Sequence, residues 1–117
     1  MTAVSSHAYF ARPGLPGQLR GIRLEYFFSA LEILQDELPS PAPPIVVLGM
    51  SRGSEAAMLT AIHSPVTVRA VVATVPGNLV AGSLPPGGPA WLLDGQPLPY
   101  AGHAGPDCCP ATLVVRT

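Results

Sequence analysis

An apolar stripe in the first third of the chain is the clearest pattern in the sequence. Its members recur at steps of three and four residues: Leu24, Phe27, Phe28, Leu31, Leu34 and Leu38. This spacing is typical of one face of an amphipathic helix, so a helix is predicted over residues 22–38. The proline-rich stretch 39–44 ends it, because proline lacks an amide proton and clashes with the preceding turn.

Two short apolar runs follow, with a helix-forming segment between them. Residues 45–48 form a continuous apolar run, as in a strand buried on both faces of a parallel sheet. Residues 68–75 are rich in β-branched side chains, which favour a strand. Small and apolar residues in 52–63 predict a helix that Pro65 ends. Together these segments have the size of one βαβ unit.

Residues 4–10 and 111–115 predict two further short strands, whereas the proline-rich segment 76–110 predicts irregular structure. The expected order through residue 75 is β-α-β-α-β, which indicates an α/β fold with one parallel sheet. The length favours a single domain over 1–117.

The composition indicates a folded but poorly charged chain. Hydrophobic residues make up 48% and charged residues 11% of 117 residues. That is too apolar for a disordered chain and low in charge for a free-standing domain. A net charge of −1 gives no reason to expect nucleic acid. With no signal peptide or membrane span in the sequence, a cytoplasmic location is expected.

No cofactor or metal motif is found. The adjacent Cys108 and Cys109 do not have the spacing of a zinc site, and they cannot build a disulfide framework. A phosphate-binding glycine-rich loop would need a lysine or a third glycine near residues 49–53, and neither is present.

The candidate chemistry lies between the predicted strand 45–48 and the predicted helix 52–63. Gly49, Ser51 and Gly53 form a Gly-x-Ser-x-Gly motif there. In such a turn the serine hydroxyl is exposed at a helix N-terminus, and the glycines allow close backbone contacts. The amide of Arg52 would point toward a developing oxyanion. A purely structural turn is the alternative, but the strand-turn-helix context favours a nucleophile elbow.

Four stretches resemble the C-terminal hydrolase domain of the acyl-CoA thioesterase and bile acid-CoA:amino acid N-acyltransferase family. They are AYFARPGLPGQLRGIRLEYFFSALEIL, VLGMSRGSEAAM, VRAVVATVPGNLV and AWLLDGQPLPY. The resemblance covers about residues 3–100, and the tail 101–117 is atypical. It implies the central part of an α/β-hydrolase fold with three layers.

The resemblance matches Ser51 to the family nucleophile and Arg52 to the oxyanion-hole amide. The N-acyltransferase members place cysteine at the nucleophile position, so serine favours hydrolysis. The implied reaction converts an acyl-CoA and water to a fatty acid and CoA. The resemblance implies no cofactor, and it leaves the oligomeric state open.

The Asp and His of a catalytic triad stay unassigned. In an α/β-hydrolase they follow the serine in the order Asp, then His, whereas His103 precedes Asp107. His7 and His63 are expected to be structural or surface residues. We therefore expect a truncated domain, weakly active or inactive alone. Another serine esterase or peptidase and a non-catalytic fragment are the alternatives.

Overall fold

The computed structural model describes residues 8–74, 76–77 and 79–101. Its elements are, in chain order, β1 (Ile22–Arg23), α1 (Glu25–Glu37), β2 (Val46–Met50), α2 (Arg52–His63), β3 (Ala70–Thr74), β4 (Trp91–Leu93) and β5 (Gln96–Pro97). This mixture of helices and strands confirms the α/β class. The strand expected at 111–115 lies outside the described residues. Of the strand expected at 4–10, only residues 8–10 are described, and they are not in a strand.

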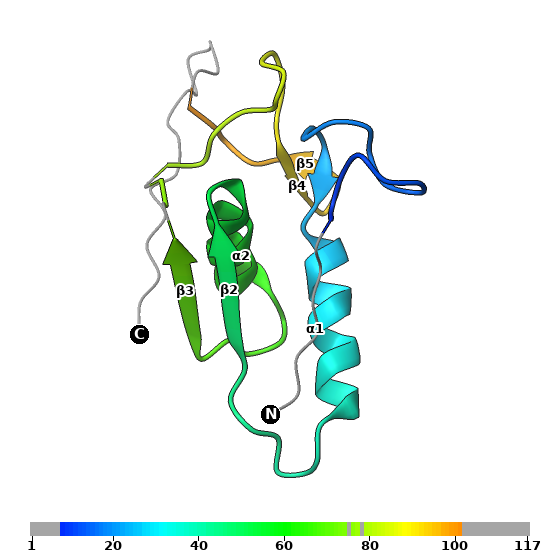
Figure 1. Ribbon diagram of the computed structural model, residues 1–117, viewed down its shortest axis with the longest axis vertical. Coiled ribbons are helices and arrows are strands. Elements are labelled where there is room, and N and C mark those ends of the chain that lie inside the picture. The colour runs from blue at the N-terminus through cyan, green and yellow to red at the C-terminus, as the bar shows by residue number, and fades with distance from the viewer. Residues whose placement is uncertain (1–7, 75, 78, 102–117) are drawn as a thin grey trace.

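The predicted βαβ unit is present. Strands β2 and β3 pair in parallel, from Val46 opposite Ala70 to Met50 opposite Thr74. Helix α2 connects them and lies behind the pair in the view of Figure 1. Two neighbouring parallel strands need a crossover connection, and α2 provides it for β2 and β3.

A second small sheet corrects the expected topology. Strand β1 pairs in parallel with β4, and β4 pairs antiparallel with β5. The prediction that all strands up to residue 75 join one sheet was therefore wrong. Helix α1 also begins at Glu25 rather than at residue 22, because Ile22 and Arg23 pair with Trp91 and Leu92.

The segment 76–110 was predicted to be irregular, yet its described part contains the β4–β5 hairpin. The two residues between these strands are Asp94 and Gly95, with φ of 52° and 77°. Positive φ at both positions is what a two-residue type I′ hairpin turn requires.

Two apolar clusters hold these parts together. The larger one joins the start of α1, the start of α2 and strand β4, and Leu24 and Trp91 are almost fully buried in it. The smaller one contains Leu31, Ile45 and Val66, which brings α1 against the start of β2. Figure 1 shows α1 beside β2 accordingly.

One face of the β2–β3 pair is open. Leu48 is 73% exposed and Met50 is 69% exposed, and Val46 and Val72 on the same face are also exposed. The predicted three-layer arrangement is therefore not found within the described part of the chain. Neither helix described there combines the length and apolarity that crossing a bilayer requires.

Candidate active site

Ser51 lies at a sharp turn between a strand and a helix. Strand β2 ends at Met50 and α2 begins at Arg52, so Ser51 alone makes the connection. Its backbone has φ 54° and ψ −123°, a combination that few residues other than glycine adopt. The residue is exposed. The turn has the geometry that the sequence predicted, whereas a catalytic role for Ser51 stays a prediction.

The two glycines of the motif have different structural roles. A Cβ atom on Gly49 would lie 2.1 Å from the carbonyl oxygen of Gly53 and 2.7 Å from the amide nitrogen of Ser54. A Cβ on Gly53 would meet nothing within 4 Å. The close backbone approach therefore requires glycine at position 49 only. The expectation that both glycines make room for the turn holds for one of them.

Backbone and side-chain hydrogen bonds fix the turn to both strands. The Ser51 amide donates to the carbonyl oxygen of Thr74 at 2.9 Å. The Ser54 hydroxyl lies 2.8 Å from that oxygen and 2.9 Å from the carbonyl oxygen of Gly49. It has one proton, so it donates to one of them at a time. Buried Ser54 thus joins the start of α2 to the ends of β2 and β3.

The Arg52 amide is the first of α2, where amides have no acceptor within their own helix. The positive end of the helix dipole lies at the same place. An oxygen carrying negative charge beside Ser51 would be stabilised by both. This arrangement suits the oxyanion-donor role expected for the Arg52 amide.

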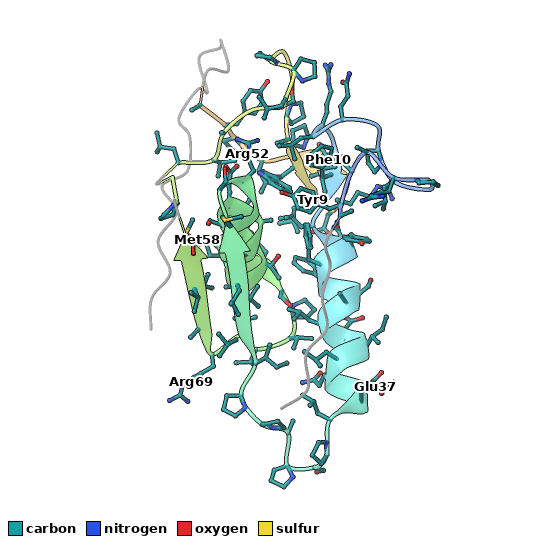
Figure 2. The ribbon with its side chains drawn as sticks, viewed as in Figure 1. Tyr9, Phe10, Glu37, Arg52, Met58 and Arg69 are labelled. Atoms are coloured by element: carbon teal, nitrogen blue, oxygen red, sulfur yellow. The ribbon has the colours of Figure 1, made fainter. Side chains whose placement is uncertain are left out.

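The Arg52 side chain has other partners than its amide. It contacts Glu55 and the segment that contains Gly82. Its Nη1 lies 3.3 Å from Oε2 of Glu55, and its Nη2 donates to the carbonyl oxygen of Gly82 at 2.5 Å. The guanidinium also lies over the ring of Trp91, 6.0 Å from its centroid. Figure 2 shows Arg52 at the upper end of α2, near Tyr9 and Phe10.

Glu55 is the centre of this network and is only 5% exposed. Its Oε1 accepts from Nε1 of Trp91 at 2.6 Å and from the amide of Ala81 at 2.9 Å. The sequence patterns did not indicate these partners. They are 36 and 26 residues away along the chain. Local patterns cannot detect such a contact.

Tyr9 completes the aromatic part of the site. Its ring lies 5.7 Å from that of Trp91 and 5.5 Å from that of Phe27. Burial raises the pKa of Tyr9 above its ordinary value, partly opposed by the charge of Arg52, with a smaller upward contribution from Glu55.

The histidines do not complete a triad with Ser51 in the described part of the chain. His63 is the last residue of α2, about 16 Å along the helix axis from Arg52 at its start. His7, His103, Asp107, Cys108 and Cys109 lie outside the described residues. Within residues 8–74, 76–77 and 79–101, no group of three His, Cys, Asp or Glu side chains is arranged to hold a metal ion.

The family model described as BAAT / acyl-CoA thioester hydrolase C terminal matches residues 22–84, which is more than half of the chain. The chain belongs to this family. The match runs from β1 through α1, β2, α2 and β3, and it contains the Ser51 turn together with Glu55 and Gly82. It confirms the family that the sequence motifs indicated.

The family description implies a substrate related to acyl-CoA. A search of curated proteins and a search of solved structures each gave no significant match. Trp91 lies beyond the matched residues, so the family match does not include its contacts with Arg52 and Glu55.

Proposed function

We propose that the chain carries the nucleophile of an acyl-CoA thioester hydrolase of the α/β-hydrolase fold, and that Ser51 is this nucleophile. The backbone of Ser51, at φ 54° and ψ −123° in the turn between β2 and α2, is the observation that carries the proposal. A strained conformation of this kind costs free energy and is typical of functional sites. Membership of an acyl-CoA thioester hydrolase family favours the same role.

In the proposed reaction the Oγ atom of Ser51 attacks the thioester carbonyl carbon. The carbon–sulfur bond breaks, CoA leaves as its thiol, and the acyl group becomes an ester of Ser51. Water then hydrolyses this ester, which releases the fatty acid and restores the hydroxyl. The Arg52 amide stabilises the oxyanion in both steps. No cofactor is needed for this chemistry.

Two alternatives stay open. A serine esterase or peptidase would use the same turn, because the turn does not determine the acyl donor. A non-catalytic role is favoured by the position of His63, which is too far from Ser51 to take its proton. A serine hydroxyl without a base is a weak nucleophile. The base must therefore come from residues other than His63.

A fluorophosphonate probe tests whether Ser51 is activated, since such probes react with activated serines. The full chain is incubated with the probe, and the modified residue is identified by mass spectrometry. Because this chain is expected to be weakly active or inactive alone, we expect slow labelling at Ser51, which Ser51→Ala abolishes. Ser29→Ala is the matched control, because Ser29 is an exposed serine on α1. It should leave the labelling unchanged.

Hydrolysis then separates the acyl donors. We expect release of CoA from an acyl-CoA to depend on Ser51 and to exceed hydrolysis of a simple ester with the same acyl chain. An unlabelled Ser51 would favour the non-catalytic role. Labelling with equal turnover of both substrates would favour the general esterase.

A further inference from the structure

The segment that leads into α1 is strongly basic. Residues 8–24 contain Arg12, Arg20 and Arg23 and no acidic residue. All three arginines are exposed. Glu25, the first acid that follows, is engaged by the amide of Asp94 at 2.6 Å, which lowers its pKa from the ordinary value. Half of the arginines of the chain therefore lie in this stretch, and Glu25 interacts with the charge of one of them, Arg23.

This basic segment lies at the Ser51 end of the molecule. In Figure 1 the loop that precedes β1 is at the upper end, where β2 meets α2. Arg69 and Glu37 are at the opposite end in Figure 2. Asp36 and Glu37 belong to the last turn of α1, so the acidic charge of that helix is concentrated away from Ser51. An anion would be attracted to the Ser51 end.

Contacts through the 82–89 loop connect the arginines to the turn. Arg52 donates to the carbonyl oxygen of Gly82, next to Ser51. Gly82 is bridged to Pro89, so the two arms of this loop lie together. On the other side of the loop Arg20 donates weakly to the carbonyl oxygen of Gly87 at 3.4 Å. The loop therefore contacts both Arg20 and the residue that follows Ser51.

A cavity of about 250 Å³ lies beside Arg23. Tyr9, Tyr26, Leu15 and Ile22 contribute to its mostly apolar wall, and Arg23 also lines it. Arg12 belongs to the adjoining turn, because its carbonyl oxygen accepts from the amide of Leu15 at 3.0 Å. The cavity is smaller than the roughly 300–1,000 Å³ of most ligand pockets. It suits one aromatic ring of a larger ligand.

We propose that Arg12, Arg20 and Arg23 bind the phosphates of coenzyme A while its adenine ring occupies the cavity lined by Tyr9 and Tyr26. This inference rests on the proposed function, and it adds a binding site for the part of the substrate that does not react. The nucleotide of coenzyme A combines a flat aromatic ring with phosphates. Guanidinium groups bind phosphate through paired, charge-assisted hydrogen bonds. The pantetheine arm would then run past the 82–89 loop toward Ser51.

Direct binding of free CoA to the full chain tests the proposal. Trp91 is the sole tryptophan of the chain, and its ring lies 5.7 Å from that of Tyr9, so its fluorescence reports on the cavity. Titration calorimetry provides a second readout. We expect Arg12→Gln, Arg20→Gln and Arg23→Gln each to weaken CoA binding about tenfold, close to the lower end of the range for a charged hydrogen bond. Higher salt should weaken binding by the wild type.

Three controls make the test specific. Arg69→Gln removes the same charge at the far end and should leave the affinity unchanged. Adenosine 3′,5′-bisphosphate should bind and show the same dependence on the arginines, whereas inorganic phosphate should bind at least tenfold more weakly. Arg20→Lys keeps the charge but not the paired hydrogen bonds, so it should retain more affinity than Arg20→Gln, which separates charge from an effect on folding.

Two results would overturn the site: a wild type that does not bind CoA, or arginine variants that bind as tightly as the wild type. An equal loss in Arg69→Gln would do the same. The outcome is independent of the nucleophile, because Ser51→Ala should bind CoA normally. Probe labelling of Ser51 with arginine-independent CoA binding overturns this site alone. Arginine-dependent CoA binding without labelling overturns the proposed function alone.

Discussion

At the scale of single residues, the most restrictive position in the turn is Gly49. Its Cα is close enough to the backbone of Gly53 that no side chain fits between them. The Ser51 backbone can hold its uncommon dihedral angles only while β2 and α2 meet this closely. The geometry of the candidate nucleophile therefore depends on a residue that has no side chain and no chemistry of its own.

The pair Gly49 and Gly53 provides a matched comparison. Gly49→Ala would place a Cβ 2.1 Å from a backbone oxygen, so we expect a loss of about 3 kcal/mol or more in the free energy of unfolding, as for other overpacked sites. Gly53→Ala meets no atom and lies in α2, where alanine exceeds glycine in helix propensity by about 1 kcal/mol. It should be neutral or stabilising.

Urea denaturation of the two variants measures this difference. Circular dichroism of both in buffer is the control for gross misfolding. If Gly49→Ala and Gly53→Ala have equal stability, β2 and α2 do not approach as closely as the structure places them.

At the scale of elements, the local part of the fold could be predicted from the sequence. The periodicity of 24–38 predicted α1, and the apolar runs predicted β2 and β3, because these signals depend on neighbouring residues. Strand β1 has only two residues, too few for any periodicity. The β4–β5 hairpin was missed although Asp94-Gly95 is a turn signal that sequence alone offers.

In the candidate site, too, local features could be predicted from the sequence and long-range contacts could not. The Ser51 turn is local, so a five-residue motif predicted it. The Glu55–Trp91 contact joins residues 36 positions apart and depends on how β4 packs against α2. Sequence patterns carry no information on that packing, because it follows from the folded core around Trp91.

Glu55 attaches the segment that contains β4 to α2, and its replacement should loosen this contact. Glu55→Gln keeps an acceptor for Trp91 but leaves the half-buried guanidinium of Arg52 without its carboxylate. We expect a loss of about 1–3 kcal/mol in the free energy of unfolding. Trp91 emission should shift to longer wavelength as water reaches the ring.

Glu32→Gln on α1 is the control for Glu55→Gln, because Glu32 is exposed and the change in charge is the same. It should alter stability by less than about 0.5 kcal/mol. Equal effects of the two substitutions would mean that Glu55 acts through net charge rather than through its contacts.

At the scale of the whole molecule, the open face of the β2–β3 pair exposes several large apolar side chains to solvent. Leu48, Met50, Val46 and Val72 expose apolar side chains on one face of a sheet with two strands. Each strand also has one edge that is unpaired within this sheet. Apolar faces and open strand edges both favour association with another chain. This face reaches the Ser51 turn, because Met50 is the residue that precedes Ser51.

Self-association should therefore depend on this face. Burying apolar surface contributes roughly 25 cal/mol per Å², so a contact that covers two large side chains on each chain gains several kcal/mol. We expect sedimentation velocity to show a larger mean mass as the concentration rises, and Leu48→Lys to reduce that rise. Ile33→Lys is the matched control, because Ile33 is 60% exposed but lies on α1, away from the sheet. A chain that stays monomeric at all concentrations, or an equal response to both substitutions, would show that the open face does not drive association.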